Sequence, residues 1–264
     1  MSDFEAIAGH VYLTGAGPGD PDLLTVRAAR LIASATCILH DGLVSPEVLA
    51  LARADAVVLD VGKRCGHKLI TQEQIHELMI EHARAGRSVV RLKSGDPMIF
   101  GRATEEMEAL DRTGVPYAVI PGITAGFAAA ALAKISLTER KNTSRVVLTT
   151  RHLAAKPDEN TAAHLPVISA GWFAPEDTES TMIFYMPGKD YARLQCELLA
   201  VGWDAAATVT LVSEASTSRQ KIVQIPLSRL QEAELLPAPM VILIQSANYS
   251  ASRTQRKPTP PERS

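Results

Sequence analysis

The feature that most constrains the fold of this chain is the alternation of short apolar runs with helical patterns in its first half. The runs have the length of buried strands, and the segments between them repeat apolar residues at helical spacing. Strands separated by helices favour a mostly parallel sheet with helices on its faces. The strands predicted in this way are Val11–Thr14, Cys37–Leu39, Ala56–Val61, Ser88–Leu92 and Tyr117–Ile120.

The second half of the chain predicts a further α/β domain with a mixed sheet. Its strand-like segments are Val146–Thr149, Met182–Met186, Thr208–Val212, Lys221–Ile225 and Met240–Gln245. Helical patterns run over Ile123–Ala133 and Tyr191–Leu199. We therefore predict an N-terminal α/β domain over residues 1–120 and a C-terminal α/β domain over residues 121–247. The tail over residues 248–264 is rich in Ser, Thr, Pro and basic residues and is expected to be disordered.

Composition excludes several classes of protein. The chain has 27 basic and 29 acidic residues, and a net charge of -2 gives no general attraction to nucleic acid or to an anionic membrane. The three cysteines are far apart and form neither a disulfide framework nor a metal-binding pair, and no metal site is expected. The first ten residues lack a signal-peptide pattern, and no apolar run is long enough to span a bilayer. A cytoplasmic protein is expected.

A glycine-rich loop, Gly15–Asp20, follows the first predicted strand. Such a loop before a helix can indicate a dinucleotide site, and Asp41 lies where an acid that binds ribose would be expected. The spacing is not G-x-G-x-x-G, however, and Pro18 and Pro21 lack the N–H groups that would bind a pyrophosphate. The loop therefore favours a ligand without phosphate, or a purely structural turn.

A second loop, Ser94–Arg102, follows another strand. Gly95 permits the backbone to approach a ligand closely, and Asp96 offers a carboxylate. An amino-acid sulfonium needs such polar contacts because it carries both an ammonium group and a carboxylate. An Asp-Pro turn that only starts the next helix is the alternative.

Five segments together resemble the uroporphyrinogen-III C-methyltransferases of the tetrapyrrole methylase family. They are residues 11–25, 40–44 (His-Asp-Gly-Leu-Val), 61–64 (Val-Gly-Lys-Arg), 94–97 (Ser-Gly-Asp-Pro) and 121–125 (Pro-Gly-Ile-Thr-Ala). The resemblance implies two α/β domains with S-adenosyl-L-methionine in the cleft between them, and a homodimer. It implies two successive methylations of uroporphyrinogen III, by way of precorrin-1, to precorrin-2.

The resemblance also implies the residues of the site. The implied cofactor contacts are Pro18, Ser94, Gly95, Asp96, Ile99, Thr124, Ala125, Met186, Ala215 and Met240. The implied catalytic and substrate-binding residues are Asp41, Lys63, Arg102, Glu105 and Arg140. The chain departs from the family pattern at Ala103, Thr104, Arg151, Pro187 and Ala215, where the family usually has glycine.

The chemistry of such a substrate explains these residue types. A tetrapyrrole with many carboxylates needs clustered cations, and arginine binds carboxylates in a bidentate manner. The pyrrole carbon is itself the nucleophile, so the enzyme chiefly aligns it with the methyl group. A proton must then leave the tetrapyrrole, and Asp41 and Glu105 are the two candidate bases. Arg102 and Glu105 are three residues apart and are neighbours if a helix begins there; a surface ion pair is the structural alternative.

Three other functions stay open from the sequence. The first is a precorrin C-methyltransferase that acts later on the corrin pathway. The second is an NAD-dependent dehydrogenase, which the glycine loop and Asp41 would suit. The third is a sensor that binds the cofactor without turnover, which Ala103, Thr104 and Arg151 would suit.

Overall fold

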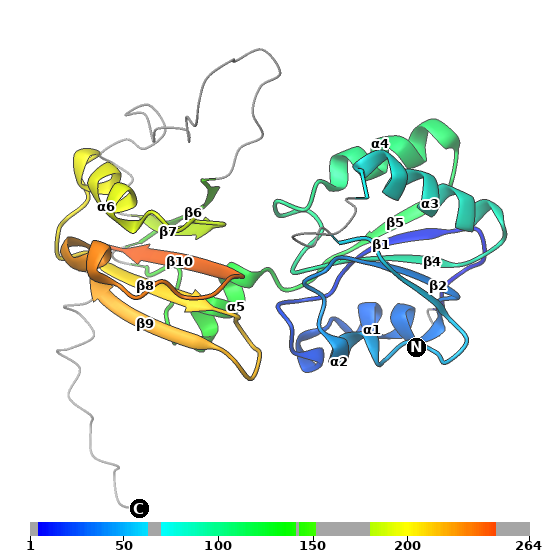
Figure 1. The fold of residues 1–264 in the computed structure, drawn as a ribbon, viewed down its shortest axis with the longest axis horizontal. Coiled ribbons are helices and arrows are strands. Elements are labelled where there is room, and N and C mark those ends of the chain that lie inside the picture. The colour runs from blue at the N-terminus through cyan, green and yellow to red at the C-terminus, as the bar shows by residue number, and fades with distance from the viewer. Residues whose placement is uncertain (1–4, 63–69, 141–142, 152–179, 247–264) are drawn as a thin grey trace, which may run out of the picture. The chain divides into compact units, whose positions relative to one another are not determined.

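The computed structural model describes residues 5–62, 70–140, 143–151 and 180–246 (Figure 1). Lys63 and the predicted disordered tail lie outside these residues. The chain forms two compact units: the first runs to Ala128 and includes Ser216–Ser218, and the second holds the rest. The division falls after Ala128, whereas the domain boundary predicted from the sequence lies at residue 120. No helix within the described residues is long and apolar enough to cross a membrane.

The first unit contains a five-stranded sheet in the order β3-β2-β4-β1-β5, and every pair of neighbouring strands is parallel. Its strands are β1 (Val11–Gly15), β2 (Cys37–His40), β3 (Val57–Asp60), β4 (Val89–Lys93) and β5 (Tyr117–Ile120). The predicted parallel sheet is therefore confirmed, with strand ends that differ by at most one residue. A parallel order of this kind requires the helical crossovers that the sequence pattern predicted.

Helices cover both faces of this sheet (Figure 1). They are α1 (Val26–Ser34) and α2 (Pro46–Leu49) on one face, and α3 (Gln72–Arg84) and α4 (Ala103–Thr113) on the other. Alternate strand residues enter different cores: Tyr12 packs with Leu31 of α1, while Leu13 packs with Met79 of α3. A sheet buried on both faces explains why its strands read as continuous apolar runs.

The second unit contains a mixed sheet in the order β6-β7-β10-β8-β9. Only β6 and β7 are parallel, and the other neighbours are antiparallel. Its strands are β6 (Arg145–Thr150), β7 (Ser180–Tyr185), β8 (Thr208–Ser213), β9 (Lys221–Pro226) and β10 (Met240–Gln245). The helix α6 (Tyr191–Ala200) and the 3-10 helix η3 (Leu227–Glu232) supply Leu194, Leu198 and Leu227 to the core against this sheet.

The helix starts partly follow the predicted signals. Thr71 and Gln74 have the spacing of a capping box in the sequence, and the box forms at the start of α3; Asp20 before Pro21 has the pattern of a second helix start. Asp20 instead caps a one-turn 3-10 helix, η1 (Pro21–Leu23), while Thr25 caps α1 by accepting the Ala28 N–H at 3.2 Å. The predicted helix over Ile123–Ala133 is shorter, α5 (Ala125–Leu132). Asp20 and Thr25 can each cap a helix and lie close together in the sequence, and the fold uses both as caps.

Candidate active site

The loops singled out in the sequence lie at one edge of the first sheet. Because its strands are parallel, their carboxyl ends meet at the same edge. The registers place Gly15 of β1 beside Lys93 of β4, and His40 of β2 beside Leu92. Asp41, the glycine loop and the loop that begins at Ser94 therefore start from neighbouring positions. Ligands of open α/β sheets bind at this edge.

Four glycines allow these loops to touch. A Cβ atom added to Gly15 would lie 2.6 Å from the Cα of Gly122 and 2.7 Å from the carbonyl oxygen of Gly95. Gly17 and Gly95 exchange two backbone hydrogen bonds, of 3.1 and 2.8 Å, and the Ala16 N–H donates to the Lys93 carbonyl at 2.7 Å. The amides of Ala16 and Gly17 thus already have partners within the protein. This arrangement argues against the pyrophosphate site of a dehydrogenase.

The Ser94–Pro97 turn is fastened by its own aspartate. The Asp96 carboxylate accepts the Met98 N–H at 2.8 Å and the Gly122 N–H at 3.0 Å, one on each oxygen. The Ser94 hydroxyl oxygen is buried and has no hydrogen-bond partner within the described part of the chain. A buried hydroxyl without a partner is a polar group that a ligand can satisfy.

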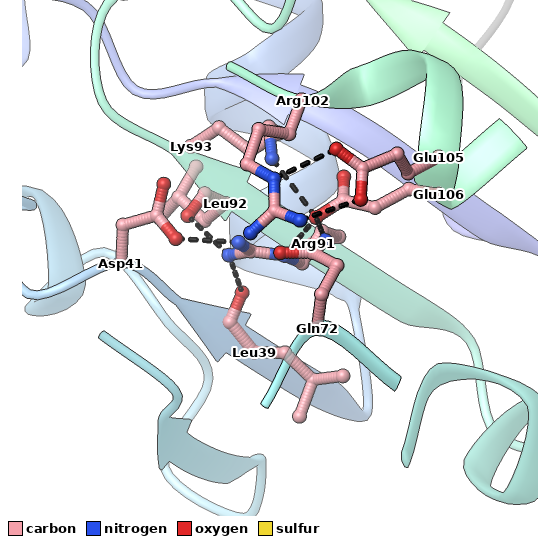
Figure 2. A network of polar contacts seen from close by, with 9 residues as sticks. All are labelled: Leu39, Asp41, Gln72, Arg91, Leu92, Lys93, Arg102, Glu105 and Glu106. Carbon is pink, nitrogen blue, oxygen red and sulfur yellow. Dashed lines mark hydrogen bonds and ion pairs between the residues drawn. The ribbon is translucent and has the colours of Figure 1, made fainter. Parts of the chain in front are cut away.

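A buried network of charged residues lies beneath this edge (Figure 2). We call it the Glu106 cluster; it comprises Asp41, Gln72, Arg91, Lys93 and Glu106. Arg91 of β4 donates to the Asp41 Oδ1 at 2.5 Å and to the Glu106 Oε1 at 3.0 Å. The same Glu106 oxygen accepts Lys93 at 2.9 Å and Gln72 at 3.3 Å. The side chains of Arg91 and Lys93 are 3% exposed and that of Glu106 is fully buried, whereas Asp41 is 33% exposed.

Arg91, Lys93 and Glu106 were not among the site residues predicted from the sequence. The available signal was two cations at alternate positions of an apolar strand, since Arg91 and Lys93 share with Val89 the face that packs against α3 and α4. Charged residues are seldom buried unless they are paired, so this pattern indicates a buried anion opposite. Burial, with a smaller contribution from Arg91, lowers the pKa of Lys93, and Glu106 opposes that shift.

Arg102 and Glu105 form a pair at the start of α4, as their spacing predicts. Arg102 Nε and Nη2 donate to the two oxygens of Glu105 at 2.7 and 2.5 Å, and both side chains are more than two-fifths exposed. Arg102 has a positive φ of 55° and directly precedes the helix. Its hydrogen bonds hold the pKa of Glu105 below the usual range. The exposed pair is thus available to a ligand.

The loop that carries Lys63 starts beside Asp41. Lys63 itself lies outside the described residues, but Gly62 before it packs against Gly42, the residue after Asp41. A side chain on Gly62 would run into the backbone of Gly42. The two strand ends therefore approach closely at the point where both predicted catalytic residues occur.

In the second unit, Met186, Ala215 and Met240 follow or begin three adjacent strands. Because β10 is antiparallel to β7 and β8, its start lies at the edge where those strands end, with Met240 beside Ser213 and Val241 beside Tyr185. Met186 is 48% exposed and has a positive φ of 47°. A left-handed conformation is unfavourable for methionine and is often found at functional sites. Arg140 is exposed on the same unit.

Arg151 does not form part of an open cationic surface. It is 5% exposed, and its guanidinium donates to Glu197 at 3.1 Å and to the carbonyls of Pro187 and Asp190 at 3.4 and 3.3 Å. Burial lowers its pKa, and Glu197 opposes this. The residue that replaces the usual glycine thus braces the turn after Met186.

Comparison with known proteins agrees with this geometry. The chain is 42% identical over 240 residues to a siroheme synthase of Psychrobacter arcticus, a match that covers 89% of this chain but 42% of that protein. The chain thus spans about half the length, or less, of the curated relatives it matches.

Solved structures are similar to this chain over about nine-tenths of its length. A uroporphyrin-III C-methyl transferase of Thermus thermophilus, complexed with S-adenyl homocysteine, is 33% identical, with a TM-score of 0.73 over 91% of this chain and 94% of that one. A cobalt precorrin-4 methyltransferase is 29% identical, with a TM-score of 0.75 over 90% and 95% of the two chains. The model of the Tetrapyrrole (Corrin/Porphyrin) Methylases matches residues 10–231. The chain therefore belongs to the tetrapyrrole methylase family.

Proposed function

We propose that this chain is an S-adenosyl-L-methionine-dependent C-methyltransferase that converts uroporphyrinogen III to precorrin-2 by two successive methylations. The observation that carries the proposal is the 33% identity to a uroporphyrin-III C-methyl transferase over 94% of that protein's chain. The siroheme synthases support it over the part of their length that this chain matches.

The residues of the carboxyl edge fit the proposed cofactor. S-adenosyl-L-methionine, when bound, supplies a methyl group on a positively charged sulfur and carries no phosphate. The buried Ser94 hydroxyl lacks a partner in the described residues, and the amides of Ala16 and Gly17 are engaged within the protein, which suits such a ligand better than a dinucleotide. The residues proposed to hold it are Pro18, Ser94, Gly95, Asp96, Ile99, Thr124 and Ala125 in the first unit, and Met186, Ala215 and Met240 in the second.

The chain's own residues have two tasks in this reaction: to hold the macrocycle and to accept a proton. We assign the carboxylates of the substrate to Lys63, Arg102 and Arg140, since cations bind such a polyanion. We assign the proton to Asp41 rather than to Glu105. The Oδ1 of Asp41 accepts a hydrogen bond from Arg91, and its Oδ2 has no hydrogen-bond partner within the described residues. Both oxygens of Glu105, in contrast, accept hydrogen bonds from Arg102.

The test is methyl transfer with a labelled cofactor. Purified chain, methyl-labelled S-adenosyl-L-methionine and uroporphyrinogen III are incubated under reducing conditions, and the tetrapyrrole is analysed by mass spectrometry. Two labelled methyl groups per macrocycle are expected. No label in the tetrapyrrole, in a preparation that binds S-adenosylhomocysteine by calorimetry, would refute the proposed activity and favour the sensor.

A precorrin C-methyltransferase is the second candidate, because the chain is 29% identical to a cobalt precorrin-4 methyltransferase. The same assay with precorrin-2 as acceptor separates the two. Label in precorrin-2 but not in uroporphyrinogen III would select this candidate.

We also propose that the chain forms a homodimer, as its resemblance to the family implied, and that it acts in the cytoplasm. Sedimentation equilibrium at micromolar concentration checks the dimer. A single species with the mass of one chain, 28.4 kDa, would contradict it.

A further inference from the structure

Glu106 is a buried carboxylate for which the proposed reaction has no direct use. Its side chain is fully buried on α4, so it does not face a ligand. Its Oε1 accepts three donors, from Gln72, Arg91 and Lys93, and its Oε2 has no hydrogen-bond partner within the described residues. Burying a carboxylate is expensive unless it is well paired, so the fold retains Glu106 at a cost.

Arg91 connects Glu106 to Asp41 (Figure 2). Arg91 Nε donates to Glu106, and Nη1 donates to the carbonyls of Leu39 and Leu92 at 3.4 and 3.3 Å. The remaining nitrogen, Nη2, donates to Asp41. Because a guanidinium is planar and rigid, fixing its Nε side also fixes the direction in which Nη2 points. The position of the Asp41 carboxylate thus depends on a contact at the other end of Arg91.

The charges of the cluster balance. Asp41 and Glu106 are two anions, and Arg91 and Lys93 are two cations, all joined by ion pairs. Asp41 alone is partly exposed, at 33%. Lys93 also precedes the Ser94 turn directly, so the same cluster lies beneath the base and the proposed cofactor loop.

We infer that Glu106 is a positioning residue that, through Arg91, holds the Asp41 carboxylate in the orientation needed to accept the substrate proton. This inference rests on the proposed function. It predicts that kcat depends on a hydrogen-bond acceptor for Arg91 at position 106, and not only on the charge balance of the cluster. A merely structural cluster would tolerate apolar replacement of an oppositely charged pair, which is often neutral or stabilising.

The test compares two double variants that keep the cluster neutral. Lys93→Met/Glu106→Met removes one cation, one anion and the acceptor for Arg91. Lys93→Met/Glu106→Gln removes the same charges but keeps an oxygen acceptor for Arg91. We expect the first to lower kcat at least about tenfold, since small misplacements of reacting groups have effects of about this size or larger. The second should recover most of that loss, and both should bind S-adenosylhomocysteine within about twofold of wild type, because binding does not use Asp41.

Glu108→Gln, on the exposed part of α4, is the matched control and should leave kcat unchanged. Thermal unfolding of each variant is measured alongside. Crystal structures of the two doubles give a readout independent of turnover: Arg91 and Asp41 should move in the Met variant and stay in the Gln variant.

The outcomes separate the inference from the proposed function. Absence of methyl transfer by wild type refutes the proposed function, and the crystal structures still decide whether Glu106 positions Asp41. Wild-type kcat in the Met double variant, or equal losses in both doubles, would overturn the inference. If neither double folds, the carboxylate serves the fold rather than the orientation of Asp41, and the inference fails as well.

Discussion

Each unit of the molecule places a glutamate against two cations, with Glu106 fully buried and Glu197 10% exposed, but the two arrangements end differently. In the first unit the Glu106 cluster runs outward to Asp41, which is partly exposed. In the second unit Glu197 accepts Arg151 at 3.1 Å and Arg193 at 2.8 Å, and we call these three residues the Glu197 cluster. Its Arg151 ends on main-chain carbonyls.

The difference indicates what each cluster does. A cluster whose outer member is a partly exposed carboxylate can orient a group that reacts with substrate. A cluster whose arginine donates to main-chain carbonyls can instead hold a segment of the chain in place. The segment held here follows Met186, whose positive φ of 47° needs support from its surroundings. We therefore expect changes in the first cluster to appear in the rate, and changes in the second to appear in stability.

The largest expected effect is that of Asp41→Asn on kcat. Asparagine keeps an oxygen for Arg91 but cannot accept the substrate proton. Loss of a general base lowers rates by between about 100-fold and 10,000-fold. Initial rates of methyl transfer measure this, with S-adenosylhomocysteine affinity expected to change less than about twofold. Asp55→Asn, an exposed aspartate of the first unit, is the control. An unchanged kcat would remove Asp41 from the chemistry.

Next in size is the effect of Arg151→Met on stability. The change leaves Glu197, whose side chain is 10% exposed, with one cation and frees the carbonyls of Pro187 and Asp190. Breaking a buried pair in this way lowers the free energy of unfolding by about 3 kcal/mol or more. Urea unfolding measures it. Arg229→Met, which breaks an exposed pair in the same unit, should cost less than about 1 kcal/mol. Similar losses in the two variants would contradict a bracing role for Arg151.

Glu105→Gln should lower kcat by about tenfold, which is less than the effect of Asp41→Asn. A tenfold loss corresponds to about the free energy of one hydrogen bond to a charged group. Glutamine still accepts one donor from Arg102, so the substrate-binding arginine is only partly released. The rate and the KM for the tetrapyrrole are compared in the two variants. A larger loss of kcat in Glu105→Gln than in Asp41→Asn would exchange their roles.

The smallest effect is a difference in pH dependence between the two clusters. Burial lowers the pKa of Lys93 below its usual value near 10.5, so the unfolded chain binds more protons between those two values. The contribution of Lys93 to stability is thus full above about pH 10.5 and is lost as pH falls through the lowered pKa, with a slope of at most about 1.4 kcal/mol per pH unit. Lys93→Met should abolish this rise in the free energy of unfolding.

Lys221→Met, on the exposed surface of β9, is the matched control and should leave the rise in place. The Glu197 cluster contains no lysine, so it should contribute no rise of this kind. A rise that persists unchanged in Lys93→Met would mean that another group titrates.

The sequence predicted most of the fold of the first unit because each signal there is local. Thr71 and Gln74 mark the start of α3 within four residues, and β1, β2 and β5 are mostly apolar runs. The Asp20–Pro21 signal was less decisive, because Thr25 stands five residues later and is an equally good cap. Competing local signals of this kind are settled only by how the chain packs.

In the candidate site, too, some features could be predicted from the sequence and others could not. The sequence placed Asp41 and Ser94 after strands, and a parallel sheet necessarily brings such positions to one edge. It did not reveal that Gln72, 34 residues away from Glu106 along the chain, shares an oxygen with Arg91 and Lys93. Charges read along a sequence look like surface charges, and only the pairing across α3, α4 and β4 shows otherwise.

By itself, the sequence determined the alternation of strands and helices, the loops at the strand ends and the family to which they are similar, since all of these are written in short segments. Only the tertiary structure decided which charges are buried and what they contact. Burial and pairing depend on residues that are distant along the chain, and the free energy of a charge depends on its surroundings more than on its neighbours in sequence. For that reason Arg91 and Arg151 are the same residue type in the sequence, while one orients Asp41 and the other supports a turn.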